Sequence, residues 1–210
     1  MIPVKVLAVR YLANATPALS KALGAPKGYP SLAMLTTDCD DATYIALDAA
    51  TKAADVKVCY GHSFYAGAAN ASTPNAGEVI GILAGPTPGT VRSGMEAALA
   101  ALETVGFDEA GNVPYLAYTV SRSGSYLAKE AGVEEGTPLA YLIAPPLESM
   151  YAMDAALKAA DVKLCKLYSP PSETNFGGGL LSGTQSACDA ACAAFAAAVA
   201  EVAAAPREGA

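Results

Sequence analysis

The sequence predicts an α+β fold built from two repeats of one domain, each a mainly antiparallel sheet flanked by helices. The main observation is internal similarity: residues 48–59 and 154–165 are identical at ten of twelve positions, at an offset of 106. A second observation is the stretch 105–112, whose Gly, Asp and Asn residues are typical of a linker. We therefore place the first repeat at residues 1–108 and the second at residues 109–210.

Both repeats are expected to have the order strand, helix, strand, helix, strand, strand, helix. Short apolar runs bounded by turn residues favour strands, amphipathic stretches favour helices, and a glycine commonly ends a helix. In the first repeat, strands are expected at residues 4–12, 31–36, 56–60 and 78–84, and helices at 16–23, 41–54 and 90–104. In the second repeat, strands are expected at 114–120, 139–144, 162–167 and 179–182, and helices at 125–131, 148–160 and 185–204.

The composition indicates a folded protein that buries much of its surface. Hydrophobic residues make up 53% of the 210 residues and charged residues 16%, which argues against disorder. The longest apolar run, residues 190–200, is shorter than the roughly 20 residues of a membrane span, so we expect no membrane partner. The N-terminus does not resemble a signal peptide, which favours the cytosol. A net charge of −7 argues against a nucleic-acid partner.

The sequence predicts neither an enzyme nor a metal or cofactor site. Five cysteines occur without a Cys-x-x-Cys pair, and a single histidine excludes the usual multi-histidine zinc site. The three glycines at 177–179 are not followed by the Gly-Lys-Ser/Thr of a phosphate loop, and no Gly-x-Ser-x-Gly is present. Asp40 and Glu78 could form an acid–base pair, but no nucleophile accompanies them. We therefore expect no catalytic residues.

The matching helices of the two repeats carry the same lysine, Lys52 in the first and Lys158 in the second. A long amphipathic side chain among alanines can lay its stem on an apolar surface and reach a partner's carbonyl groups. The same rim would then occur twice in each chain. Three chains of two repeats would make a pseudo-sixfold disc, which is an ordinary closed symmetry.

Residues 46–57 and 153–163 resemble the signature helix and following strand of bacterial microcompartment (BMC) shell domains. The first strand and short helix precede this signature instead of following it, so each repeat resembles a circularly permuted BMC domain. The tandem permuted class of ethanolamine-utilisation shell proteins is the most similar. Further matching stretches are residues 38–46, 65–68, 76–78, 120–127, 140–148 and 170–176.

The resemblance implies a homotrimeric, pseudohexameric tile that packs edge to edge with other shell proteins around cytoplasmic enzymes. Lys52 and Lys158 match the edge lysine of such tiles. By the same resemblance, loops 61–77 and 169–179 gate a central pore. The large gating residues would be Phe64, Tyr65, Asn175 and Phe176. Three small acidic pores would hold ethanolamine or a similar small amine, lined by Asp40, Asp41, Glu78 and Phe107. Cobalamin is a further candidate to cross the central pore.

Several alternatives stay open from the residues themselves. Asp40 or Asp41 could cap the helix that follows. Glu78 could be a solvated charge at a strand end, and the loop aromatics could pin the loops to the domain body. A soluble trimer that binds a small metabolite without forming a shell is the main alternative function.

Overall fold

The computed structural model describes residues 1–64, 77–170, 172 and 174–207. The chain divides into two compact units, each containing most of one repeat. The N-terminal unit comprises Pro3–Val105 with Gly124–Leu127, and the C-terminal unit comprises Met1–Ile2, Gly106–Ser123 and Ala128–Ala210. The four residues at 124–127 thus belong to the second repeat in sequence but to the N-terminal unit in space.

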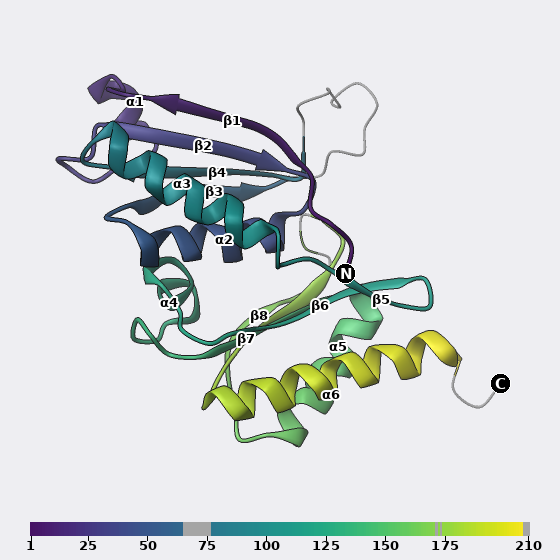
Figure 1. The fold of residues 1–210 in the computed structure, drawn as a ribbon. Helices are drawn as coiled ribbons and strands as arrows, with labels where there is room; N and C mark the ends of the chain where they lie inside the picture. Colours follow the sequence, from purple (N-terminus) through teal and green to yellow (C-terminus); the bar gives the residue numbers. More distant parts are fainter. Residues whose placement is uncertain (65–76, 171, 173, 208–210) are drawn as a thin grey trace. The chain divides into compact units, whose positions relative to one another are not determined.

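The N-terminal unit is a four-stranded antiparallel sheet in the order β1-β2-β4-β3. Its strands are β1 (Val6–Leu12), β2 (Ser31–Thr37), β3 (Lys57–Ser63) and β4 (Val79–Gly85). Helices α2 (Asp40–Ala53) and α3 (Pro88–Leu102) pack against each other and cover one face of the sheet (Figure 1). The short helix α1 (Pro17–Ala22) lies between β1 and β2 in the chain and has no buried residue.

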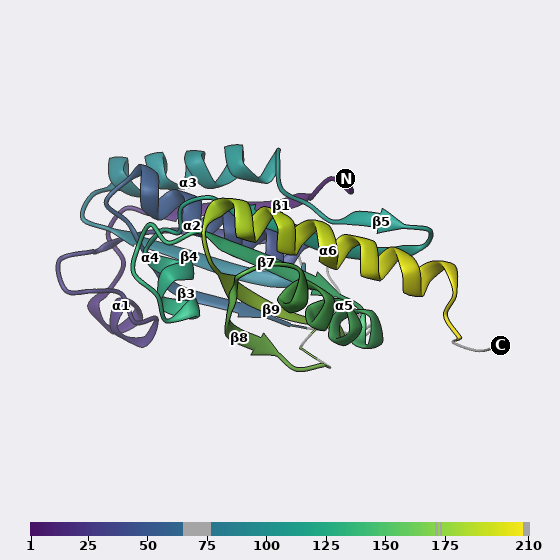
Figure 2. The same cartoon turned by 90° about the horizontal axis from the view of Figure 1, so that it is seen from below.

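The C-terminal unit is a five-stranded antiparallel sheet in the order β5-β6-β7-β9-β8. Its strands are β5 (Asp108–Ala110), β6 (Val113–Val120), β7 (Leu139–Ala144), β8 (Lys163–Tyr168) and β9 (Gly177–Ser182). Helices α5 (Pro146–Ala159) and α6 (Gln185–Ala204) pack against each other and on the sheet (Figure 2). Helix α4 (Ser125–Ala131) begins in the segment assigned to the N-terminal unit.

Each unit has its own apolar core between sheet and helices. In the N-terminal unit, Leu35 and Leu83 of the central strands and Leu47 of α2 are buried there. Leu32 of β2 belongs to a second, smaller apolar cluster with Ile82 and Ala84 on the other face of the sheet. In the C-terminal unit, Phe195 of α6 and Leu142 of β7 are fully buried among alanines of both helices. Alanine-rich helices allow the two backbones to approach closely, and burial of the larger side chains supplies the main stabilisation.

Threonine side chains cap the starts of three helices. The Thr16, Thr87 and Thr184 hydroxyls accept hydrogen bonds from backbone N–H groups in the first turns of α1, α3 and α6. Such a cap satisfies one of the N–H groups that a helix start leaves without an intrahelical acceptor. All seven elements expected in each repeat are present, and the α+β class is confirmed.

The strand registers make the two repeats comparable residue by residue. Gly61 of β3 pairs with Gly81 of β4, and Leu167 of β8 pairs with Gly179 of β9. A register shift follows Val58 in one repeat and Leu164 in the other. The repeats therefore share one topology, β1, β2, β4 and β3 corresponding to β6, β7, β9 and β8.

The structure corrects the prediction at three places. Strand β5 lies within the segment predicted to be a linker, because Asp108–Ala110 pairs with the start of β6. Strand β3 runs on to Ser63, three residues into the predicted loop, because β4 continues beside it. Strand β9 begins at Gly177, in the predicted second loop. There the φ of Gly178 is +147°, and an added Cβ would lie 1.9 Å from the Leu142 carbonyl oxygen.

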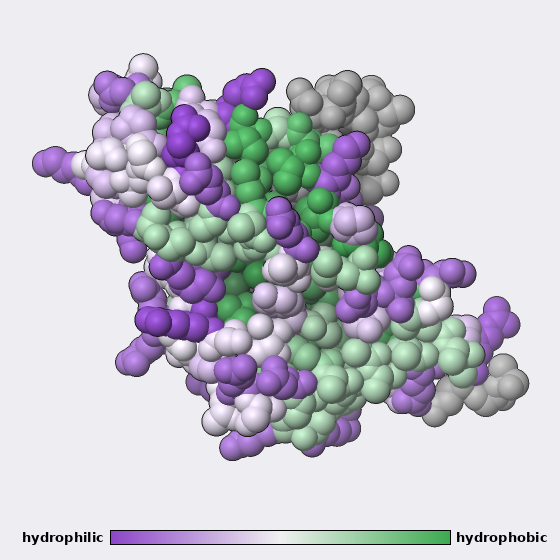
Figure 3. Space-filling view, viewed as in Figure 1, coloured by the Kyte–Doolittle hydropathy of each residue, from purple (hydrophilic) through white to green (hydrophobic). Residues whose placement is uncertain are grey.

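Helix α6 is, by length and composition, the one helix in the described part of the chain that could cross a membrane. The estimate from run length alone was therefore too strict. Cys188 and Phe195 of α6 are nevertheless fully buried in the C-terminal core. Alanines occupy much of its outward side, which appears pale green in Figure 3. Because the core helix of a soluble protein passes the same test, this feature is weak evidence for a membrane.

Candidate pore and rim residues

Three of the four predicted small-pore residues converge at one end of the N-terminal sheet. Asp40 and Asp41 form the first turn of α2, just after β2 ends, and Glu78 directly precedes β4. Strands β2 and β4 are antiparallel neighbours, so the end of one lies beside the start of the other. The Glu78 backbone N–H donates to the Thr37 carbonyl at 2.9 Å. The sheet register therefore brings the three carboxylates to one place.

The protein environment opposes ionisation of two of these carboxyl groups, Asp40 and Glu78. Burial raises the pKa of Asp40, although hydrogen bonds from the Ser63 hydroxyl and the Asp41 backbone N–H partly offset that rise. Burial also raises the pKa of Glu78, and the negative charges of Asp40 and Asp38 add to the effect. Like charges held together in a partly desolvated site disfavour the ionised form unless a cation joins them. The arrangement therefore suits a small cationic ligand.

The structure also tests the capping alternative for Asp40 and Asp41. The N-cap of α2 is Cys39, whose side chain makes no capping hydrogen bond. The Asp40 carboxylate accepts from the Asp41 N–H at 2.9 Å, and both acids stand in the first turn. Carboxylates there are favoured by the helix dipole. Asp40 therefore contributes to the helix start while standing in the acidic cluster.

Cys39 stands among these carboxylates as a neutral thiol. Burial raises its pKa, and the charges of Asp41, Asp40 and Glu78 raise it further. A thiol kept protonated is a poor nucleophile and a poor metal ligand. Within the described residues, no group of three or more His, Cys, Asp or Glu side chains could hold a metal ion.

The fourth predicted small-pore residue, Phe107, belongs to the C-terminal unit. Its ring meets that of Phe176 edge to face, with centroids 5.5 Å apart. Such an aromatic pair contributes about 0.5–1.5 kcal/mol beyond its burial. The structure thus joins a predicted small-pore residue to a predicted gating residue, a contact that the sequence did not indicate.

Two of the remaining predicted gating residues, Phe64 and Asn175, lie near loop ends within the described residues. Phe64 follows β3 directly and its backbone N–H donates to the Glu78 carbonyl at 2.9 Å, while its side chain is exposed. Asn175 has a φ of +65°, in a turn where the Ser172 N–H donates to the Phe176 carbonyl. Tyr65 lies outside the described residues. Backbone hydrogen bonds therefore hold Phe64 and the turn around Asn175 within their own units.

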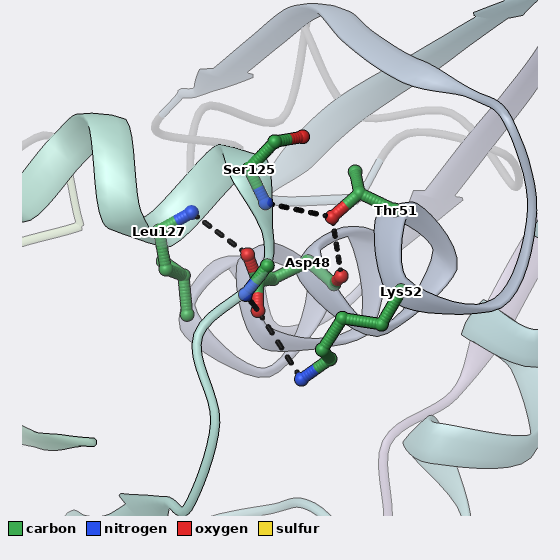
Figure 4. Close-up of polar contacts among 6 residues, drawn as sticks. Asp48, Thr51, Lys52, Ser125 and Leu127 are labelled. Atoms are coloured by element: carbon green, nitrogen blue, oxygen red, sulfur yellow. Dashed lines mark hydrogen bonds and ion pairs between the residues drawn. The ribbon is translucent and has the colours of Figure 1, made fainter. Parts of the chain in front are cut away.

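The first predicted rim lysine, Lys52, is held by a buried carboxylate. Lys52 Nζ lies 3.3 Å from Asp48 Oδ2, and the Asp48 side chain is fully buried (Figure 4). Asp48 also accepts hydrogen bonds from the backbone N–H groups of Gly124 at 2.7 Å and Leu127 at 2.8 Å. Asp48 thus caps the start of α4 from a different helix.

The second predicted rim lysine, Lys158, has a different environment. It forms an ion pair with Asp154 on the same helix, and the two side chains are 75% and 63% exposed. Sequence reasoning singled out the lysines and missed the aspartates that accompany them four residues earlier. The signal was available, because Asp48 and Asp154 open the repeated twelve-residue segment.

Comparison with known proteins decides the family. The BMC domain model matches residues 31–115. The bacterial microcompartment shell protein EutL of Clostridium perfringens (strain 13 / Type A) is 57% identical over 210 residues, covering 98% of this chain and 97% of the relative. The chain belongs to the EutL family of bacterial microcompartment shell proteins. EutL of Escherichia coli (strain K12) is 48% identical over 207 residues, covering 97% of this chain and 94% of the relative.

Solved EutL structures confirm the fold. The crystal structure of EutL from Leptotrichia buccalis C-1013-b superposes with a TM-score of 0.94 at 58% identity, covering 98% of this chain and 96% of that one. The BMC match begins at β2, after β1 and α1, as a circular permutation of the domain predicts. The EutL family is a family of structural shell proteins, and it places this chain in a microcompartment shell, as predicted from the sequence.

Proposed function

We propose that this shell protein is a non-catalytic trimeric tile, with a loop-gated central pore and small acidic pores that bind or pass ethanolamine-like amines. The proposal that the small pores bind an amine is supported by the acidic cluster of Asp40, Asp41 and Glu78. This cluster lies where β2 ends and β4 begins. The trimer, the rim contacts to other shell proteins and the gating loops rest on membership of the EutL family together with the two-repeat architecture.

The acidic cluster has the chemistry that a small ammonium ion requires. A bound cation relieves repulsion between the carboxylates and replaces part of the hydration that burial removes. One hydroxyl group stands close by, because Ser63 hydrogen-bonds to Asp40. The carboxylates can therefore attract the ammonium group of such a ligand, and the site can hydrogen-bond to its hydroxyl group. Phe107 enters this proposal by resemblance alone, as an aromatic face for the ammonium.

Isothermal titration calorimetry with ethanolamine tests the acidic pore. The variant Asp40→Asn with Glu78→Gln keeps side-chain size and removes two charges, so binding should weaken by at least tenfold. A control, Glu134→Gln with Asp161→Asn, removes the same charge from exposed positions and should bind as wild type does. Equal affinity of the cluster variant and the wild type would overturn the small-pore assignment.

Electron microscopy of the purified protein separates the tile from the alternative of a soluble metabolite-binding trimer. Flat sheets or tubes are expected of a tile, whereas discrete trimers at every concentration and salt condition would favour the soluble module. An absorbance titration with cobalamin tests that second candidate ligand of the central pore. A spectrum that stays unchanged with saturating protein would remove cobalamin from the proposal.

A further inference from the structure

Two hydroxyl groups stand in a row behind the carboxylate of Asp40. The Ser63 hydroxyl, at the end of β3, hydrogen-bonds to Asp40 and partly offsets the rise in pKa that burial causes. The Tyr44 hydroxyl of α2 lies 2.6 Å from Ser63 Oγ. Asp40 and Tyr44 are about one helical turn apart on α2, and all three residues belong to the N-terminal unit. We call the row Tyr44–Ser63–Asp40 the hydroxyl relay.

The direction of both hydrogen bonds follows from the number of protons available. A serine hydroxyl has one proton, and an ionised carboxylate has none to donate. While Asp40 is ionised, Ser63 donates its proton to it, so the short contact with Tyr44 is a hydrogen bond that Tyr44 donates. Hydrogen bonds in such a row polarise one another, and each strengthens the next. The relay therefore favours the carboxylate form of Asp40.

The ring of Tyr44 is held in place by packing. It lies beside the ring of Tyr126, with centroids 6.0 Å apart. It also passes close to Gly61 of β3, where an added Cβ would lie 3.4 Å from Tyr44 Cε1 and 3.1 Å from the Tyr126 hydroxyl. A glycine at this position leaves room for both rings. Because packing fixes the ring, the Tyr44 hydroxyl meets Ser63 without a large further loss of side-chain entropy.

The second repeat shows which residues accompany the relay. Four positions can be matched between the repeats by helix length and strand register. The acids and the tyrosine are replaced in the second repeat by apolar residues, and only the serine is kept. The matched pairs are Asp40 with Pro146, Tyr44 with Met150, Glu78 with Phe176 and Ser63 with Ser169. A tyrosine hydroxyl needed only for the fold would be expected in both repeats.

The relay opposes the influence that would neutralise Asp40. Burial raises the pKa of Asp40, and the neighbouring ionisable groups are the acids Asp38, Asp41 and Glu78 and the thiol of Cys39. A neutral carboxylic acid attracts an ammonium ion far less than a carboxylate does. A donor that favours the ionised form of Asp40 therefore extends cation binding to lower pH.

We propose that Tyr44 is a positioning residue of the small acidic pore, which through Ser63 holds Asp40 in the ionised form that attracts an ammonium ligand. The Tyr44 hydroxyl donates to Ser63 Oγ, and the Ser63 hydroxyl donates to the carboxylate. Tyr44 thus acts on the ligand only through Ser63 and Asp40. The inference rests on the proposed function, because ionisation of Asp40 matters to the pore only if the ligand is a cation.

Calorimetric titration with ethanolamine, repeated from about pH 8 to about pH 5, tests the relay. Tyr44→Phe keeps the ring and removes the hydroxyl, so the pH at which binding falls to half should rise by about 0.5 unit. Ser63→Ala removes the donor itself and should raise that pH by about one unit, which is a tenfold loss of affinity on the acidic side. Near pH 8, where Asp40 is ionised in every variant, affinities should agree within about twofold. A Tyr44→Phe affinity reduced by the same factor at every pH would assign Tyr44 to structure alone and overturn the proposal.

Two further variants make the test specific to the relay. Tyr60→Phe makes the same chemical change on β3, but Tyr60 packs in the apolar cluster on the other face of the sheet, so the wild-type pH profile should be kept. Ser63→Thr keeps a hydroxyl and should restore most of the shift caused by Ser63→Ala. A Tyr60→Phe profile shifted as far as that of Tyr44→Phe would overturn the relay, and so would a Ser63→Thr profile equal to that of Ser63→Ala.

A double variant tests whether Tyr44 acts through Ser63. Tyr44→Phe combined with Ser63→Ala should have the pH profile of Ser63→Ala alone, because the tyrosine hydroxyl then has no serine to act on. Two shifts that add in the double variant would show that Tyr44 influences the ligand by another route, which contradicts the relay.

The relay can also be tested without a ligand, which separates its failure from that of the proposed function. Carbon-13 NMR of the Asp40 carboxyl group, assigned with the variant Asp40→Asn, follows its titration in the ligand-free wild type and in Tyr44→Phe. The midpoint should lie at higher pH in the variant, and an unmoved midpoint would overturn the relay whether or not ethanolamine binds. A wild type that binds no ethanolamine, with the midpoint moved as expected, would refute the proposed ligand and leave the relay standing.

Discussion

The two repeats share a fold and a twelve-residue segment, yet the same aspartate–lysine pair behaves differently in each. In the first repeat, Asp48 is fully buried and accepts two backbone N–H groups from the start of α4, while its pair with Lys52 is partly shielded. In the second, Asp154 and Lys158 are mostly exposed. The comparison teaches that one sequence motif serves as an internal helix cap or as a surface pair, depending on whether a helix is docked against it.

A further contrast separates the fourth strands of the two repeats and predicts the largest effect. Gly178 of β9 corresponds to Ile80 of β4, but only Gly178 has a positive φ and a carbonyl 1.9 Å from an added Cβ. Gly178→Ala should lower the free energy of unfolding by about 3 kcal/mol or more, since backbone must move. The control Gly111→Ala also has a positive φ but open space, and should lose only about 1 kcal/mol. Denaturant titration measures both, and equal losses would contradict the steric argument.

Alanine at the two repeated aspartates tests the comparison directly. Asp48→Ala should lower the free energy of unfolding by about 2–3 kcal/mol, because it leaves buried N–H groups of Gly124 and Leu127 without an acceptor. Asp154→Ala should change it by less than about 0.5 kcal/mol, as exposed pairs contribute little. Thermal unfolding of both variants gives the measurement. Similar shifts in the two melting temperatures would mean that the difference in burial has no energetic consequence.

The two lysines should differ in lattice assembly. Lys52→Ala with Lys158→Ala should leave trimers intact and abolish sheets, because both rims lose their amphipathic side chain. Of the single variants, Lys158→Ala should impair sheets more, since Lys158 is 75% exposed whereas Lys52 is 33% exposed and paired with buried Asp48. Electron microscopy of sheet formation compares them. Normal sheets from the double variant would contradict the rim assignment.

The smallest expected effect concerns pH and the acidic cluster. Because the folded-state pKa values of Asp40 and Glu78 are raised, the folded state binds protons at a higher pH than the unfolded chain does. Burial of both carboxylates, and for Glu78 also the charges of Asp40 and Asp38, should therefore reduce stability above the raised pKa values, and stability should recover as pH falls through them.

Ethanolamine binding should have the opposite pH dependence, weakening on acidification before ordinary carboxyls near pH 4 titrate. Calorimetry across pH, with the Asp40→Asn and Glu78→Gln variant as the reference, follows the change. A binding constant that stays flat down to pH 4 would exclude ionised cluster carboxylates from the site.

The candidate site was only partly predictable from the sequence. Asp41 begins a predicted helix, Asp40 directly precedes it, and Glu78 begins a predicted strand, so their positions along the chain were foreseeable. Their proximity depends on the pairing of β2 with β4. The edge-to-face contact of Phe107 with Phe176 joins residues far apart in the chain and has no local signal. Strand β5 was missed because three residues are too few for a periodic pattern.

The sequence by itself determined the duplication, the order of elements and the family resemblance, because repeats, hydrophobic periodicity and capping residues are local properties of the chain. Only the tertiary structure decided which of the two repeated aspartates is buried. Asp48 accepts a hydrogen bond from Gly124, which lies 76 residues further along and directly precedes α4. That contact exists only because the segment 124–127 packs into the N-terminal unit. Long-range packing gives different roles to equivalent residues of the two repeats, such as Asp48 and Asp154. The reason is that burial and hydrogen-bond partners depend on neighbours in space that no local sequence pattern specifies.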